Sequence, residues 1–247
     1  MIKSVSWLFF LLIRSFKMKL LTTTGNTKVK KTNKDSEYLM ASLSMMPDSI
    51  LCPQSKIAEC FDPCLKSAGF AGVYKTVNEA RQRKTDYWHN DKKGFLQQLE
   101  RELTNHVKNC EKKGKKPACR LNTISDIVWE KTDIINKFSQ ITFIDYTKNA
   151  SRLGKTPENY HLIFSFSNAP NYQLSVKKAF KTDSPIAVVF KGRLPTSFNG
   201  RQVINGDKSD LINSLSGKGK IIGLLAKGKA RKDGGNFVVN PDLIAIG

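Results

Sequence analysis

The chain has 247 residues, 40% of them hydrophobic, which is enough to bury the core of one α/β domain and excludes a disordered chain. It carries 41 basic and 21 acidic residues, a formal net charge of +20. Such a charge favours nucleic acid, or a small anionic or nucleotide-like ligand, as a partner. The five cysteines are an odd number, and three of them are bunched. This is unlike the disulfide framework of a secreted protein and indicates a reducing cytoplasm.

An apolar run at residues 6–13 lies between basic residues near the amino terminus. It is much shorter than the roughly 20 apolar residues that a membrane-spanning helix needs, so we predict no stable membrane span. No cleavage site of small residues follows it. We expect translation to begin at Met18, with residues 1–17 a start-site artefact or a short hydrophobic leader.

Residues 18–50 are predicted to form an N-terminal arm. Residues 22–35 are polar and basic, which is typical of a surface loop. Residues 36–51 place apolar side chains at helical spacing, although an extended conformation fits almost as well. The stretch LCPQSKIAECFDPCL, residues 51–65, then carries Cys52, Cys60 and Cys64. Its prolines predict a loop, so we expect a cysteine-bearing loop near the amino terminus.

A long helical region follows, over residues 77–94 and 95–114. Its second part places an apolar stripe on one face: Phe95, Leu96, Leu99, Leu103 and Val107. Cys110 extends this stripe and is expected to be a core residue, while Gly114 ends the helix.

Short apolar runs then alternate with amphipathic segments. The runs predict strands at residues 118–122, 141–147, 161–167, 185–191 and 221–228. Helices are predicted at residues 125–138, with Ser125 as the N-cap, and at 171–180. Continuous apolar runs are typical of parallel strands that are covered on both faces. We therefore predict an α/β fold with one domain over residues 51–247: a parallel (β/α) barrel, complete or partial, or an open doubly wound sheet.

Polar residues gather at the carboxyl ends of these strands, where barrels and open α/β sheets bind ligands. Candidates for orienting hydroxyls or an amino group, and so for catalysis, are Asn122, Ser125, Asp126 and Asp145. Candidates for binding the acidic groups of a ligand or cofactor are Arg81, Arg83, Lys148, Ser165 and Lys227. A solvated helix face explains Arg81 and Arg83 equally well.

Familiar catalytic motifs are missing from the sequence. It contains no phosphate loop of the form GxxxxGK[ST], no GxSxG and no HExxH. The three histidines are scattered, and structural roles are expected for His106 and His161.

Cys52, Cys60 and Cys64 are the candidate metal ligands. Structural zinc uses four ligands, usually from closely spaced cysteine pairs, whereas the spacing here is seven and then three residues. Asp62, His89 or Cys119 are candidates for a fourth ligand. Three thiolates alone suit a [4Fe-4S] cluster with one iron open to an external ligand. The sequence alone does not decide between a zinc site and an iron-sulfur cluster.

The three-cysteine loop resembles that of radical S-adenosylmethionine enzymes, which are (β/α) barrels of the TIM-barrel kind. In those enzymes the cysteine spacing is three and then two, with an aromatic residue before the last cysteine, where Pro63 stands here. The resemblance implies an iron-sulfur cluster, with S-adenosylmethionine as the ligand of its open iron.

The chain also resembles a bacteriophage family called gene product 88, over nearly the whole length from Met18. The resemblance rests on the segments LTTTGNTK, CPQSKIAECFDPCLKSAG, EARQRKTDYW, RLNTISDIVWE, FIDYTKN, YHLIFSFSN, AVVFKGRLP and IIGLLAKGKARKD. It implies a phage or prophage origin, and thus the host cytoplasm as the location, but no activity.

Two other hypotheses belong to different classes. One is a nucleic-acid-binding protein with a structural zinc, in which Tyr87, Trp88 and Trp129 stack on bases among basic groups. The other is a structural or host-takeover protein whose cysteines are reduced and idle.

Overall fold

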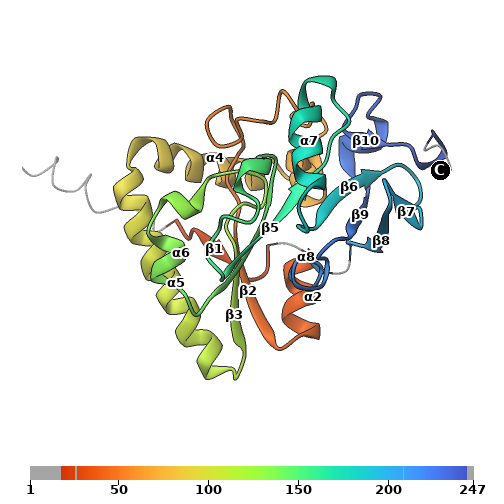
Figure 1. Cartoon of the computed structure of the whole chain (residues 1–247). Coiled ribbons are helices and arrows are strands. Elements are labelled where there is room, and N and C mark those ends of the chain that lie inside the picture. The colour runs from red at the N-terminus through yellow and green to blue at the C-terminus, as the bar shows by residue number, and fades with distance from the viewer. Residues whose placement is uncertain (1–17, 26, 208, 244–247) are drawn as a thin grey trace, which may run out of the picture.

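The computed structural model describes residues 18–25, 27–207 and 209–243 (Figure 1). The expectations for residues 1–17 lie outside the described residues. Within the described part of the chain, no helix is both long enough and apolar enough to cross a membrane.

A ten-stranded sheet forms the centre of the molecule, in the order β1-β2-β3-β4-β5-β6-β9-β8-β7, with β10 paired to β6. The parallel neighbours are β2 (Tyr38–Leu43), β3 (Lys116–Arg120), β4 (Thr142–Thr147), β5 (Tyr160–Ser165), β6 (Ile186–Phe190), β9 (Ile221–Leu225) and β8 (Arg201–Asn205). β10 (Val238–Val239) is parallel to β6, whereas β1 (Leu21–Thr22) and β7 (Ser197–Phe198) are short antiparallel edges.

Two sets of helices cover the two faces of the sheet (Figure 1). The crossover helices are α4 (Lys75–Asn90), α5 (Lys92–Lys112), α6 (Ile134–Lys137) and α7 (Gln173–Phe180), after the single turn α3 (Phe70–Val73). The opposite face carries α2 (Thr27–Asp35) and α8 (Asp210–Ser216). Short 3₁₀ turns are η1 (Leu65–Ser67), η2 (Trp129–Lys131), η3 (Ala150–Arg152), η4 (Pro170–Tyr172), η5 (Gly228–Lys232) and η6 (Pro241–Leu243).

Strand alternation divides the apolar side chains between these two faces. Cys119 and Phe143 enter the large core under the crossover helices, which also contains the buried stripe of α5. Ala118 and Ile144, their neighbours in sequence, pack instead with Val29 of α2 and Leu211 of α8. The stripe predicted for α5 is confirmed, and Cys110 is a buried core residue, as expected.

The sheet is open, so the structure is not a complete barrel. The order is consecutive from β2 to β6, as in a barrel, but the described pairings run from β1 at one edge to β7 at the other and do not join these two edges. The face that would line a barrel interior is filled by α2 and α8. The predicted α/β class with a mostly parallel sheet is confirmed.

Residues 18–50 contribute to the fold rather than forming an arm on its surface. Residues 27–35 were expected to be a loop and form α2 instead. Residues 38–43 form β2 beside β3, so the extended conformation is correct there and the helical one is not. At the edge, the Glu102 carboxylate of α5 accepts the backbone N–H groups of Leu20 (3.0 Å) and Leu21 (2.7 Å). This contact occupies donors that an edge strand would otherwise expose.

The helix predicted over residues 125–138 is wrong for most of its length, because only η2 and α6 form there. Asn122 Oδ1 accepts hydrogen bonds from Ser125 Oγ (2.9 Å), the Ile127 amide (3.0 Å) and Trp129 Nε1 (3.2 Å). Such local bonds from an asparagine compete with helical bonds. Ser125 therefore serves this turn and is not an N-cap.

Candidate functional site

The cysteine loop, residues 51–65, is a series of turns held by its own hydrogen bonds. Cys52 N donates to Asp48 O (2.9 Å), Ser55 Oγ donates to Cys52 O (2.7 Å) and Cys60 N donates to Ser55 O (3.0 Å). These bonds link Cys52 and Cys60 through Ser55.

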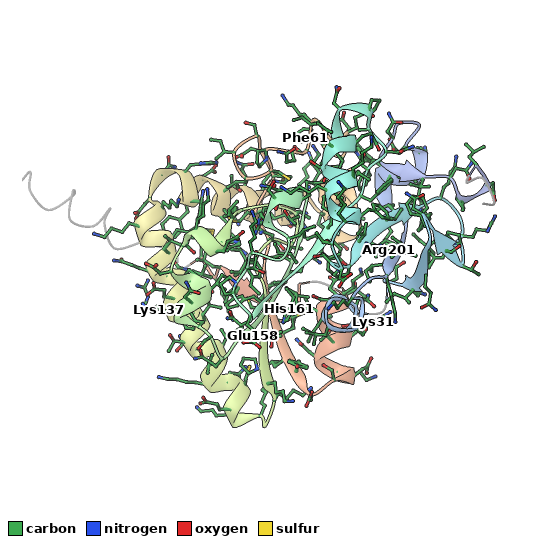
Figure 2. All side chains as sticks on the ribbon, viewed as in Figure 1. Lys31, Phe61, Lys137, Glu158, His161 and Arg201 are labelled. Carbon is green, nitrogen blue, oxygen red and sulfur yellow. The ribbon has the colours of Figure 1, made fainter. Side chains whose placement is uncertain are left out.

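Asp126 connects this loop to the carboxyl ends of β3 and β4. Its amide donates to Leu51 O at 2.7 Å, and its Oδ2 accepts the Lys148 amide at 2.7 Å. Cys52 therefore lies next to the segment that follows β4. Figure 2 shows Phe61 of the cysteine loop at one end of the molecule, while His161, at the start of β5, lies toward the other end.

The thiols of Cys52, Cys60 and Cys64 lie within electrostatic range of one buried lysine, Lys148. All three cysteines are half-buried, and each interacts electrostatically with the Lys148 ammonium. Burial is the main cause that raises the pKa values of the Cys52 and Cys60 thiols, and the neighbouring thiols raise them further. Neutral thiols of this kind are weak nucleophiles, so burial outweighs the lowering effect of Lys148 on the pKa values of Cys52 and Cys60.

Lys148 is fixed on several sides. Its Nζ donates to Phe166 O at 3.0 Å and lies 5.3 Å from the Tyr172 ring and 4.7 Å from the Phe237 ring. Tyr172 OH donates to the Lys148 carbonyl at 2.5 Å. Only 5% of the lysine is exposed, and burial lowers its pKa. The aromatic side chains lie far away in the sequence and carry no local motif, so sequence reasoning missed them.

Asp126 is bound to an arginine that the sequence analysis did not single out. Arg152 Nη1 donates to Asp126 Oδ1 at 2.7 Å, and its Nε and Nη2 donate to the Glu130 carboxylate at 2.7 and 2.8 Å. Arg152 and Asp126 are both buried. Both oxygens of Asp126 thus accept bonds from the protein itself.

Asp145 is also occupied by internal donors. Its Oδ1 accepts a hydrogen bond from the backbone N–H of Asn122 at 2.6 Å, and its Oδ2 accepts one from Tyr160 OH at 2.9 Å. Burial is the largest cause of a rise in its pKa to about 7. Together with Asn122 and Ser125, it organises the backbone behind the cysteine loop.

The remaining predicted binding residues fall into two groups. Arg81 interacts with Cys64 and donates to Asn78 Oδ1 at 3.2 Å, so it borders the thiols. Arg83 is exposed on α4, and Lys227 pairs with Asp207 at 2.5 Å after β9. Ser165, at the end of β5, offers its carbonyl to Tyr172 OH at 3.3 Å. In the described part of the chain, no contact joins Arg83 or Lys227 to the thiols.

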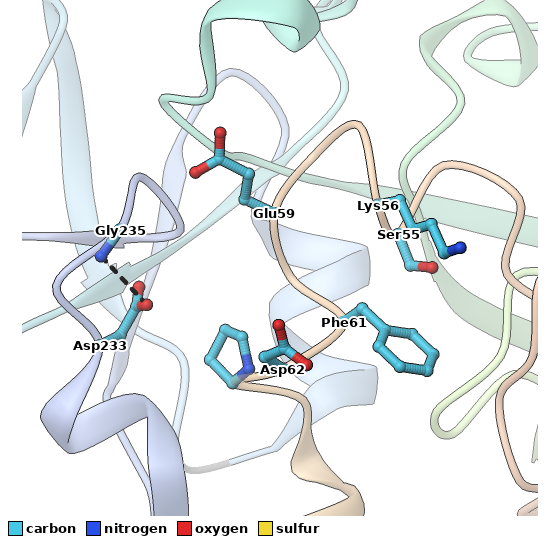
Figure 3. Close-up of a pocket in the computed structure, with 8 residues that line it drawn as sticks. Ser55, Lys56, Glu59, Phe61, Asp62, Asp233 and Gly235 are labelled. Carbon is cyan, nitrogen blue, oxygen red and sulfur yellow. Dashed lines mark hydrogen bonds between the residues drawn. The ribbon is translucent and has the colours of Figure 1, made fainter.

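A pocket of about 440 Å³ opens beside the cysteine loop, between it and residues 233–235 (Figure 3). Three carboxylates, from Glu59, Asp62 and Asp233, and one lysine, Lys56, contribute to its lining. Asn236 Nδ2 fixes Glu59 Oε2 at 2.9 Å. The acidic lining of this pocket attracts a cation more than an anion, although the whole chain is basic.

The aromatic residues proposed to stack on nucleic acid serve the core instead. Trp88 and Trp129 are 7% and 0% exposed, and their rings meet edge to face at 5.3 Å. Tyr87 is half-buried and packs against Phe95. The two buried tryptophan rings offer no face to a base, so their part in the nucleic-acid hypothesis is wrong.

The candidates for a fourth zinc ligand do not complete a site. His89 Nε2 bonds Asp48 Oδ2 at 2.7 Å, and Cys119 is fully buried in the core. Among the described residues, no group of three or more histidine, cysteine, aspartate and glutamate side chains is placed to hold a metal ion, and this includes the three cysteines of the loop.

Comparison with known proteins identifies a family and no activity. No curated protein and no solved structure is detectably similar to this chain. The model of one family, described as gene product 88, matches residues 18–240. The match includes the cysteine loop, Lys148 and all the strands of the sheet. The chain therefore belongs to the gene product 88 family.

Proposed function

We propose that this protein holds an iron-sulfur cluster through Cys52, Cys60 and Cys64. The observation that carries the proposal is that one loop, anchored on the segment after β3 by the Asp126 amide, carries all three half-buried cysteines. The cysteine loop lies at the carboxyl edge of a parallel sheet, which is where α/β proteins bind ligands.

The charge of Lys148 supports thiolates at this site. A buried ammonium is costly unless an anion accompanies it. The carboxylate of Asp126 already bonds Arg152 and the Lys148 amide, so its charge is shared. Burial disfavours the charged form of Lys148, and thiolates near it would favour that form. Thiols that bind a metal are deprotonated, and three thiolates would supply the missing negative charge.

The number of cysteines in the loop matches a cluster with one open iron and is one short of a structural zinc site. Zinc in structural sites takes four ligands at close range, with zinc-sulfur distances of about 2.3 Å. The described residues include no such group. A four-iron cluster instead spans thiolates that stand further apart, and three cysteines leave one iron for a ligand from outside the loop.

The acidic pocket beside the loop suits a cationic ligand, although none of the three cysteines lines it. S-adenosylmethionine carries positive charge at its sulfonium and amino groups, which Glu59, Asp62 and Asp233 would attract. We propose it as the first compound to test. When bound, a cluster of this kind supplies one-electron chemistry, and the chain holds the cluster and neutralises its charge.

Single cysteine variants test this proposal. Cys52→Ser, Cys60→Ser and Cys64→Ser should each lose most of the iron that the wild type retains after purification without oxygen. Cys110→Ser is the matched control, because Cys110 lies in the α5 core away from the loop, and it should keep its iron. Equal iron in all four variants, or one zinc per chain in the wild type, would contradict the proposal.

A binding measurement tests the ligand. Titration of the iron-loaded protein with S-adenosylmethionine should show saturable binding that weakens in the variant Glu59→Gln/Asp62→Asn. Salt should also weaken it, because the lining carboxylates are exposed to solvent. An affinity that neither the substitutions nor salt changes would show that the acidic pocket does not bind S-adenosylmethionine.

A further inference from the structure

Two neighbouring parallel strands end in matching basic turns. β6 and β9 are paired along their whole length, up to Phe190 opposite Leu225, and Figure 1 shows them side by side. They continue as KGR, residues 191–193, and as KGK, residues 227–229. Both glycines have positive φ, 72° and 57°, a backbone conformation that favours glycine. The Ala226 amide donates to Phe190 O at 3.0 Å, so the two turns begin next to each other.

The 3₁₀ turn η5 extends this basic surface. It includes Lys229, Arg231 and Lys232, and the bond from the Ala230 amide to Lys227 O, at 3.1 Å, closes it. η5 lies against η1, the turn that follows Cys64, so this surface is next to the cysteine loop. We call the six exposed side chains the basic edge: Lys191, Arg193, Lys227, Lys229, Arg231 and Lys232.

The protein neutralises only part of this charge. Lys227 pairs with Asp207 at 2.5 Å. Arg193 pairs with Asp242 at 2.6 Å, and this pair is exposed. Asp233, which follows η5, accepts backbone amides of its own loop. In the part of the chain that the structure describes, the other four cations of the basic edge form no ion pair. They are therefore available to an anion from solution.

We propose that the basic edge binds the phosphate backbone of a nucleic acid without reading its sequence. Exposed lysines bind a single phosphate weakly, because water and salt screen their charge. A nucleic acid instead presents many phosphates in a row and releases counterions when cations replace them. Phosphate contacts need no base stacking, so the burial of the tryptophans does not affect them. This inference goes beyond the proposed cluster and does not depend on it.

An anionic membrane is the other polyanion that such a surface attracts. Amphipathic helices bind membranes through an apolar face that enters the lipid, in addition to their charges. The basic edge consists of strand ends and the five-residue turn η5, whose one apolar side chain, Ala230, is buried. This favours nucleic acid as the partner.

Fluorescence anisotropy with a labelled DNA oligonucleotide of mixed sequence, single-stranded or as a duplex, tests the proposal. The variant Lys229→Gln/Arg231→Gln/Lys232→Gln removes three charges from the basic edge. The matched control is Lys108→Gln/Lys112→Gln/Lys113→Gln, which lowers the net charge equally. It removes three exposed lysines at the end of α5, just before β3 begins and thus at the opposite edge of the sheet.

The wild type should bind both forms of DNA, with an affinity that falls as salt rises. Four phosphate contacts to a single strand predict a slope of about −3 in a plot of log affinity against log salt concentration, and the loss of three contacts should bring it to about −1. At about 0.1 M salt the basic-edge variant should bind at least tenfold more weakly, whereas the control should stay within threefold of the wild type.

Three results would overturn the proposal. The first is a wild type that binds neither form of DNA at about 0.05 M salt. The second is equal weakening in the two triple variants, which would assign binding to the net charge of the chain. The third is binding to vesicles that contain phosphatidylserine without binding to DNA.

Thermal unfolding checks that the variants fold. Both triple variants should unfold at the wild-type temperature, because the substituted side chains are exposed. If the basic-edge variant does not fold, Lys191→Gln, in the turn after β6, takes its place and should weaken DNA binding at least threefold. An unchanged affinity in that variant would also overturn the proposal.

Discussion

Burial shifts Asp145 and Lys148, two neighbours at the end of β4, toward their neutral forms. Burial lowers the pKa of the lysine and raises that of the aspartate to about 7. The two residues have different partners: Asp145 accepts hydrogen bonds from the Asn122 backbone N–H and Tyr160 OH, whereas Lys148 Nζ donates to Phe166 O.

The raised pKa of Asp145 predicts a pH-dependent stability. Between its ordinary pKa of 3.8 and about 7, the folded state holds a proton that the unfolded state releases. This contribution to the free energy of unfolding is therefore largest at low pH and falls as pH rises to 7, by about 1.4 kcal/mol per pH unit. Asp145→Asn should lose this dependence, because its amide oxygen still accepts the Asn122 amide without ionising.

Urea denaturation of both proteins at steps from pH 4 to 8 measures the effect. His106 has a lowered pKa because it is buried, and its contribution changes with pH in the opposite direction. The His106 contribution is the same in both proteins, so it cancels in the difference between their free energies of unfolding. The contributions of Arg120 and Arg152, which face Asp145, cancel in the same way. The variant should gain stability relative to the wild type as pH rises from 4 to 7. A difference that is constant over this range would refute the shift.

At the scale of the element, α8 is fixed on the sheet by a buried carboxylate. Asp210, its first residue, accepts hydrogen bonds from Lys28 Nζ (2.9 Å), from Tyr146 OH (2.8 Å) and from Arg120 Nη1. The Arg120 and Lys28 charges lower the pKa of Asp210 although burial opposes this. The ion pair links α8 to α2, β3 and β4, which explains how two short helices cover this face.

Removal of that carboxylate should destabilise the protein strongly. Asp210→Ala leaves Arg120 buried without its partner, and we expect a loss of about 3–5 kcal/mol in the free energy of unfolding. Asp242→Ala is the control, because its pair with Arg193 is exposed and should contribute less than about 1 kcal/mol. Chemical denaturation compares them, and similar losses would show that Asp210 does not anchor α8.

The end of α8 is tightly packed at a glycine. A Cβ at Gly217 would lie 2.2 Å from Asn213 O and 2.7 Å from Ile222 Cδ1, so Gly217→Ala should cost about 1–3 kcal/mol through overpacking. At Gly234 no atom lies within 4 Å of such a Cβ, and Gly234→Ala should change stability by less than about 0.5 kcal/mol. Equal unfolding midpoints for the two variants would contradict the packing described at α8.

Elements of this fold could be predicted from the sequence where the pattern that specifies them lies within the element itself. β4, β6 and β9 were predictable because each is a short apolar run bounded by polar residues. α8 was not predicted, because its anchor, Asp210, pairs with Arg120 and Lys28, which are 90 and 182 positions away in the sequence. The thiols were found from their spacing and Lys148 from the end of a strand, but Tyr172 and Phe237 are brought to Lys148 only by the fold.

At the scale of the whole molecule, the candidate site lies beside the carboxyl ends of β3 and β4 in an open, mostly parallel sheet. Consecutive strands from β2 to β6 bring the segments after β3 and β4 beneath the cysteine loop. α2 and α8 fill the opposite face, so the loop and its pocket lie outside the sheet rather than within a barrel. This arrangement places the thiols half-exposed at the rim while the cation beneath them stays buried.

Iron and acid-labile sulfide analysis, with a visible absorption spectrum, tests the central claim most directly. The full chain should be purified without oxygen and, if empty, reconstituted with iron and sulfide. The account predicts a brown protein with about four irons and four sulfides per chain. Colourless protein that retains no iron after reconstitution, or that holds one zinc instead, would contradict it.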